Sequence, residues 1–164
     1  MLQRKPTRLH GFNYANNGYY FVTICVKNRK AYFGNVVDRQ MILNQLGEII
    51  ESSWLDLINH YNNCLLDEYI IMPNHMHGIV VINNQCVGEG FKPSPTDRKI
   101  YSLFEIIRGF KTFSSRRMHE LYTKEFQWQR SFYDHIIRNE TSLNSIRNYI
   151  RYNPYKWDID EYNT

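Results

Sequence analysis

The chain has 164 residues, of which 43% are hydrophobic and 15% aromatic, so it can bury a core and is not an intrinsically disordered protein. Its 20 Lys and Arg residues against 16 Asp and Glu give a net charge of +4, a mild bias towards polyanions that many unrelated proteins share. No apolar run approaches the roughly 20 residues of a membrane span, and the N-terminus lacks a signal-peptide core, so we expect a cytoplasmic protein with no membrane partner.

The first half of the chain predicts a strand, a helix and a pair of strands. β-Branched and aromatic residues fill residues 18–28, which is the composition of a strand. Apolar residues spaced at threes and fours predict an amphipathic helix over residues 38–61. Two strands follow at 64–72 and 75–83, and the Pro-Asn step between them suits the centre of a tight turn.

The second half predicts a loop, a helix, a strand and a last helix. Gly and Pro residues mark 83–99 as a loop. Residues 100–122 have helical periodicity, and the aromatic segment 125–137 is expected to be a fourth strand. A last helix over 141–153 ends before Pro154. The predicted inward residues of the 100–122 helix are Leu103, Ile106, Ile107 and Phe110.

The first six predicted elements follow the order β-α-β-β-α-β, which is typical of the ferredoxin-like split βαβ sheet. We therefore expect an α+β fold, in which an antiparallel sheet carries helices on one face and an extra C-terminal helix follows. No linker, repeat or low-complexity tract divides the chain. Residues 1–164 are thus predicted to form one domain, with 1–17 as a flexible basic arm and 156–164 as a short tail.

Two histidines one residue apart, His75 and His77, open the predicted strand at 75–83. Side chains alternate along a strand, so both imidazoles should share one face beside the turn. An isolated His-x-His is more often structural than metal-binding. Burying two neighbouring imidazoles without a task costs desolvation free energy, however, and a divalent ion removes that cost. Two ligands are too few, so a metal site requires a third from elsewhere in the chain.

The last predicted helix offers a third ligand and a nucleophile. Tyr149 and Asn153 lie at i and i+4 on one flank of its apolar face, whereas Tyr152 points to the far side. The amide oxygen of Asn153 can complete a metal shell, and Tyr149 can attack a group that the metal polarises. Because the chain has 13 tyrosines, packing is the commoner role for any one of them.

Three segments together resemble the REP-associated tyrosine transposases, a group within the single-tyrosine HUH transposases of insertion sequences. They are DEYIIMPNHMHGIVVI, FKTFSSRR and WQRSFYDHIIRNETSLNSIRNYIRYNP, and the resemblance covers most of residues 18–157. His-x-His alone is a weak signal, but MPNHMH combined with a downstream YIxxNP pattern is specific. The resemblance implies an enzyme with a ferredoxin-like sheet that cuts and joins single-stranded DNA bearing hairpins or palindromic repeats.

The resemblance also implies roles for individual residues. His75 and His77 match the HUH metal ligands, Asn153 matches the third ligand, and Tyr149 matches the nucleophile that forms a 5′-phosphotyrosine. Two imidazoles and an amide by themselves favour zinc or another transition metal, whereas the family resemblance implies Mg²⁺ or Mn²⁺, which we prefer for phosphoryl chemistry. Many members of the wider group are homodimers, which leaves a homodimer open for this chain.

Basic residues of the second half are candidates for contacts with DNA phosphates, and an aromatic residue among them is a candidate for base stacking. Exposed arginines on helices are often only solvated, and aromatic residues more often belong to the core. The candidate DNA-binding residues are Lys111, Arg116, Arg117, Arg130, Arg138, Arg147, Arg151 and Trp128.

Two other functions are consistent with the same residues. A domesticated relative that kept the fold would bind DNA hairpins without cutting them, although intact His75, His77, Tyr149 and Asn153 argue against such decay. A zinc-dependent hydrolase would use the same histidines with water, and it would need no tyrosine and form no covalent product.

Overall fold

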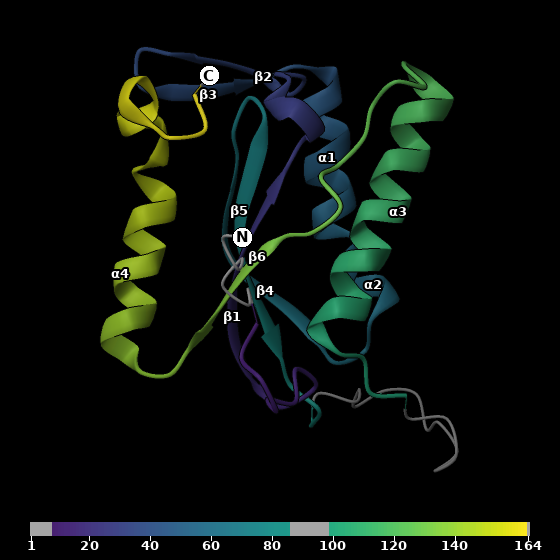
Figure 1. Ribbon diagram of the computed structural model, residues 1–164, viewed down its shortest axis with the longest axis vertical. Coiled ribbons are helices and arrows are strands. Elements are labelled where there is room, and N and C mark those ends of the chain that lie inside the picture. The colour runs from purple at the N-terminus through teal and green to yellow at the C-terminus, as the bar shows by residue number, and fades with distance from the viewer. Residues whose placement is uncertain (1–7, 86–98, 164) are drawn as a thin grey trace, which may run out of the picture.

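A four-stranded antiparallel sheet lies between helices in the computed structural model, which describes residues 8–85 and 99–163 (Figure 1). The predicted arm before residue 8 and most of the predicted loop at 83–99 lie outside the described residues. The strand order is β4-β5-β1-β6, which places β5 and β1 in the centre and confirms the α+β split βαβ sheet. The strands are β1 (Gly18–Cys25), β4 (Cys64–Ile71), β5 (His75–Ile82) and β6 (Tyr133–Ile137).

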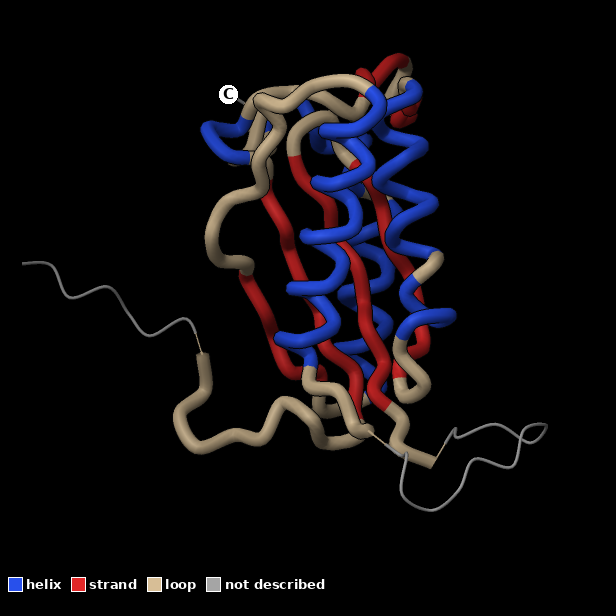
Figure 2. The backbone as a smooth tube through the Cα atoms, turned by 90° about the vertical axis from the view of Figure 1, so that its right-hand side faces the viewer, coloured by secondary structure: helices blue, strands red, loops and turns tan. Residues whose placement is uncertain are grey.

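The larger hydrophobic core lies between the sheet and the helices α1 (Gln45–Leu55), α2 (Leu57–His60) and α3 (Leu103–Leu121). Figure 2 shows α1 and α3 in front of the strands that they cover. Trp54 of α1 and Phe110 of α3 meet edge to face in this core, with ring centroids 5.3 Å apart. The predicted inward stripe of α3 is confirmed, because all four of its residues are buried.

The last helix, α4 (Glu140–Arg151), packs on the opposite face of the sheet (Figure 1). Leu143 and Ile150 are buried there against Phe21 of β1 and Ile79 of β5, which confirms the predicted apolar face. Asn139 caps the helix by accepting a hydrogen bond from the backbone N–H of Ser142 at 2.8 Å. A 3₁₀ helix, η2 (Asn153–Ile159), follows with Pro154 in its first turn.

The predicted helix at 38–61 is wrong over its first seven residues. A hairpin of β2 (Gly34–Val37) and β3 (Gln40–Leu43) comes first, and the helix starts only after Asn44, whose side chain accepts a hydrogen bond from the backbone N–H of Gly47. The two turn residues of the hairpin have φ values of 49° and 62°. This is the geometry of a type I′ turn, which Asp-Arg does not signal by composition.

Other predicted boundaries also moved, and the last helix ends at Arg151, so that Asn153 lies in η2 rather than at its predicted end. The predicted strand at 125–137 is regular only in β6, because earlier in this segment only Trp128 makes an isolated bridge, to Val26. The first strand ends at Cys25, where the 3₁₀ turn η1 (Lys27–Arg29) begins after Val26. Among the described helices, none is both long and apolar enough to span a bilayer.

Gly78 is expected to be indispensable for packing α1 on the sheet. A Cβ at this position would lie 2.4 Å from Cζ2 of Trp54, a side chain that is fully buried and cannot move away. Gly78→Ala should therefore lower the free energy of unfolding by about 1–3 kcal/mol, measured by urea denaturation. Trp54→Phe removes the clashing ring atoms, so the alanine should cost less in that background; equal costs in both backgrounds would refute the clash.

Candidate active site

His75 and His77 lie inside the sheet, on the central strand β5 opposite Cys25 and Thr23 of β1. They are 0% and 1% exposed, and they share one face as expected from their spacing. Their Nε2 atoms are 3.1 Å apart, with no other side chain between them. Two donors bound to one small divalent ion have about this separation when each ligand bond is about 2.1 Å.

Asn74 determines which ring nitrogen of His75 carries the proton. Its Oδ1 lies 2.8 Å from His75 Nδ1, while its Nδ2 donates to the carbonyl oxygens of Arg29 and Tyr162 at 3.0 and 2.7 Å. Because both amide donors are engaged, Oδ1 acts as the acceptor and Nδ1 of His75 as the donor. The Nε2 atom of neutral His75 therefore keeps its lone pair directed at His77.

The hydrogen bond with Thr23 is compatible with either tautomer of His77. Its hydroxyl oxygen lies 2.7 Å from His77 Nδ1, and a hydroxyl can donate or accept. With the hydroxyl donating, His77 carries its proton on Nε2 and can donate it to His75. With the hydroxyl accepting, the proton sits on Nδ1, and the lone pairs of both Nε2 atoms face the same space, as a shared metal ion requires.

Both imidazoles are neutral at neutral pH. Burial, with a smaller contribution from the Arg29 charge, lowers the pKa of His75 to about 3. Burial and then the neighbouring His75 lower the pKa of His77 well below its ordinary value. Neutral imidazole is the form that binds a metal ion, so neither histidine needs to lose a proton first.

Tyr149 reaches the histidines from α4. Its hydroxyl lies 3.5 Å from His77 Nε2, and its ring packs edge-on against Phe21, which stacks on the His77 ring. The side chain is still 41% exposed, so a substrate can approach it. Burial and the nearby Asp160 carboxylate raise the pKa of Tyr149, although a hydrogen bond with Asn153 opposes this. At neutral pH the phenol is thus protonated.

Asn153 begins η2, with only Tyr152 between it and the end of α4, and is 2% exposed. Among the described residues its Oδ1 has no hydrogen-bond partner, and an unsatisfied buried oxygen costs roughly 1–3 kcal/mol. A cation would remove this cost. No three His, Cys, Asp or Glu side chains in the described part of the chain group as a metal site, so a metal ion at His75 and His77 would require a ligand of another kind, such as this amide.

The C-terminal tail contributes contacts that the sequence did not suggest. The centroid of the Tyr162 ring lies 4.5 Å from that of the His75 ring, and the Trp157 ring stacks with His75 at a centroid distance of 6.0 Å. Arg29 donates to the carbonyl oxygen of Glu161 and so holds the tail down. No sequence pattern around Tyr162 or Thr23 indicates a role at this site, whereas Asn74 is part of the MPNHMH pattern.

A β-bulge in β4 holds α4 in place. Between Leu66 and Tyr69 the pairing with β5 shifts register, so Asp67 and Glu68 together face Ile79. Consecutive strand residues normally point to opposite faces, but here both carboxylates pair with α4. Asp67 accepts from Arg147 Nε and Nη2 at 2.8 and 2.6 Å, and Glu68 pairs with Arg151 one helical turn later.

Most of the candidate DNA-binding residues are engaged within the chain. Arg147 and Arg151 make the bulge ion pairs, and Arg117 pairs with Asp56. Trp128 is 9% exposed, its indole N–H donates to Ser114, and it therefore offers no free face for stacking. Arg130 and Arg138 are exposed and make no ion pair among the described residues. Lys111 and Arg116 line a groove on α3.

No protein-family model matches the chain. An uncharacterized protein of Haemophilus influenzae is 36% identical over 168 aligned positions, which cover 96% of this chain and 92% of that protein.

Two solved structures have a similar fold. A REP-associated tyrosine transposase bound to a REP hairpin has a TM-score of 0.54 at 21% identity, over 93% of this chain and 74% of that one. A provisionally assigned transposase from Deinococcus radiodurans has a TM-score of 0.50 at 16% identity, over 88% of this chain and 96% of that one. The resemblance predicted from the sequence is thus confirmed at the level of the fold.

The bulge ion pair should contribute to stability in a pH-dependent way. Hydrogen bonds from Arg147 hold the pKa of Asp67 below its ordinary range, so this contribution is present at neutral pH and is lost as the pH falls through the folded-state pKa. Asp67→Asn should lower the free energy of unfolding by about 1–3 kcal/mol at pH 7. The two proteins should become equally stable in acid, well below about pH 4.

Glu120→Gln is a matched control for this prediction. It removes an Arg–carboxylate pair of similar chemistry, from Arg116 to Glu120, in which both side chains are more than half exposed. Its effect on unfolding should be below about 1 kcal/mol. Equal effects of the two substitutions at pH 7 would show that the bulge does not anchor α4.

Proposed function

We propose that the protein is a transposase that cuts and rejoins single-stranded, hairpin-bearing DNA. The chain belongs to one family with the Haemophilus influenzae protein, and it has the fold of the REP-associated tyrosine transposases. The observation that carries the proposal is the meeting of three side chains from two distant segments, β5 and α4. Tyr149 of α4 lies within 3.5 Å of His77, which faces His75 at 3.1 Å. The Tyr149 hydroxyl is thus placed to act as a nucleophile on a phosphodiester bound beside the imidazoles.

In the proposed reaction Tyr149 is the nucleophile. Its oxygen bonds to the phosphorus as the bond from phosphorus to the 3′-oxygen breaks, which leaves a 5′-phosphotyrosine and a free 3′-hydroxyl. The phenol loses one proton and the 3′-oxygen gains one. Because the phosphodiester bond is exchanged rather than hydrolysed, attack by another 3′-hydroxyl can reverse the step and join a different strand.

His75, His77 and Asn153 would hold a divalent ion, Mg²⁺ or Mn²⁺. When bound, such an ion supplies positive charge that offsets the charge of the phosphate. Three features of the chain support this assignment: both Nε2 atoms face one another, burial keeps the imidazoles unprotonated, and the Asn153 oxygen lacks a partner among the described residues. Asn74 and Thr23 then act as positioning residues that direct the imidazole lone pairs.

The phosphate also needs a route to Tyr149. Phe21 closes one side of the tyrosine ring, and the C-terminal tail covers His75, so the exposed part of the Tyr149 side chain is where substrate enters. The fold neighbour bound to a REP hairpin supports a DNA hairpin as the substrate.

Metal binding can be tested without activity. Titration of the purified protein with Mn²⁺, followed by calorimetry or by the Mn²⁺ electron paramagnetic resonance signal, should show one site. Asn153→Leu removes the amide oxygen at similar volume and should weaken affinity at least about ten-fold. Tyr149→Phe should bind as the unchanged protein does. Retained affinity after replacement of both His75 and His77 by Asn would refute the assignment.

The nucleophile can be tested by trapping the covalent product. Incubation with Mn²⁺ and a single-stranded hairpin substrate should give a protein–DNA adduct that survives denaturation and carries only the fragment 3′ of the cut. Tyr149→Phe removes one oxygen and should abolish the adduct, measured by gel shift and peptide mapping.

Tyr152→Phe is the control, since Tyr152 is 55% exposed at the C-cap of α4 and should be dispensable. Cleavage without any adduct would favour a hydrolase that uses water, and hairpin binding without cleavage would favour a non-catalytic binding module. An adduct mapped to another tyrosine would also contradict the proposal.

A further inference from the structure

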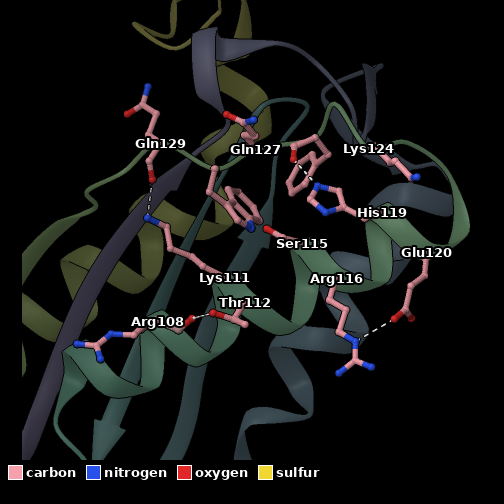
Figure 3. Close-up of a pocket in the computed structure, with 12 residues that line it drawn as sticks. Arg108, Lys111, Thr112, Ser115, Arg116, His119, Glu120, Lys124, Gln127 and Gln129 are labelled. Atoms are coloured by element: carbon pink, nitrogen blue, oxygen red, sulfur yellow. Dashed lines mark hydrogen bonds and ion pairs between the residues drawn. The ribbon is translucent and has the colours of Figure 1, made fainter.

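A second concave surface, the α3 groove, lies between α3 and the segment that leads from α3 to β6 (Figure 3). Its volume is about 880 Å³. Within the described residues it shares no lining residue with the site of His75, His77 and Tyr149, because α3 and α4 pack on opposite faces of the sheet. The lining residues include Arg108, Lys111, Arg116, His119, Glu120 and Lys124.

The groove concentrates the positive charge of the protein. Its twelve lining residues include four Lys or Arg and one Glu, a net charge of +3, whereas the whole chain has +4. Uncharged hydrogen-bonding side chains, among them Ser115 and Gln127, lie between the cations. A surface of this kind attracts a polyanion, and phosphates are the anions most readily bound by a row of Arg and Lys.

Two of the basic side chains hold the walls of the groove together. Lys111 Nζ donates to the carbonyl oxygens of Gln129, Arg130 and Ser131, at 2.6, 3.3 and 3.3 Å. His119 Nε2 donates to the carbonyl oxygen of Phe126 at 2.7 Å. These bonds fix the 126–131 segment against α3, as the dashed lines from both side chains indicate in Figure 3. The groove is therefore preformed rather than assembled by its ligand.

Three other cations remain at its rim. Arg108 and Lys124 are exposed and make no ion pair in the described part of the chain. Arg116 pairs only with Glu120, in a contact too exposed to compete strongly with a phosphate. Arg108 and Arg116 are two helical turns apart, roughly 12 Å. This matches the roughly 12 Å width of the major groove of B-DNA, so both can reach phosphates of one duplex.

The floor of the groove argues for a duplex rather than a single strand. Phe126 is fully buried and Trp128 is 9% exposed, so neither ring presents a face on which an unpaired base could stack. Single-strand binding surfaces derive much of their affinity from such stacking. A rim of cations over a covered floor instead suits the outside of a double helix, where only phosphates and sugars are presented.

We propose that the α3 groove binds the duplex stem of the hairpin DNA through its phosphates. This inference rests on the proposed function and adds a second contact surface to it. Binding the stem on the α3 side leaves the α4 side to the strand that is cut. The base sequence of the stem then has little influence at this surface, since the contacts are to the backbone.

The test compares two double variants with equal loss of charge. Arg108→Gln/Lys124→Gln removes two rim cations, whereas Arg39→Gln/Lys99→Gln removes two exposed cations that do not line the groove. Fluorescence anisotropy with a labelled hairpin, over a range of salt concentrations, gives the affinity and its salt dependence. The groove variant should bind about ten-fold more weakly, and its slope of log K against log salt should be smaller by about 1.8.

A stemless strand of the same loop and flank sequence separates the alternatives. The groove variant should bind this strand as the unchanged protein does, and the control variant should match the unchanged protein on both DNAs. Equal losses in the two double variants, or an unchanged hairpin affinity in the groove variant, would overturn the proposal. If the unchanged protein binds the hairpin through the groove but forms no tyrosine adduct, the stem site stands and the proposed chemistry fails.

Discussion

The position of α4 against the sheet is the constraint on which the candidate active site depends. Leu143 and Ile150, with the partly buried Ile146, supply the apolar contact with the sheet, and apolar contacts are non-directional. The ion pairs of Asp67 and Glu68 with arginines one turn apart set the axial position of the helix. Because Tyr149 lies between those two arginines, the same contacts bring its hydroxyl to His77.

The buried polar groups beneath α4 then acquire a common explanation. Two adjacent imidazoles and an amide oxygen without a partner among the described residues are expensive to keep away from water. Asn74 and Thr23 satisfy the outer nitrogens, and the two inner Nε2 atoms face only each other and the Tyr149 hydroxyl, while the Asn153 oxygen has no partner among the described residues. A stable protein that keeps these groups buried is consistent with a cation as their partner. The polar cluster therefore fits the metal site proposed above.

The two faces of the sheet have different tasks in the proposed function. The α4 face presents the tyrosine and the histidines, and there Arg147 and Arg151 are paired with the carboxylates of the bulge. The α3 face carries most of the excess positive charge in a preformed groove. Attraction of DNA and reaction with DNA are thus separated, which allows affinity to depend on salt without placing surplus cations beside the nucleophile.

The sequence by itself determined relations within single elements. Strand alternation put His75 and His77 on one face, because backbone geometry sets this period. Helical spacing predicted Tyr149 beside Asn153, although α4 ends at Arg151 and Asn153 begins the 3₁₀ helix η2. The sequence did not predict the hairpin before α1, because the residue types of Asp38 and Arg39 do not indicate their positive φ values. Only the tertiary structure decided which elements meet: that Thr23 serves His77, that Tyr162 covers His75, and that Arg147 pairs with Asp67. Such partners depend on strand register and helix packing, which bring together residues far apart in the chain.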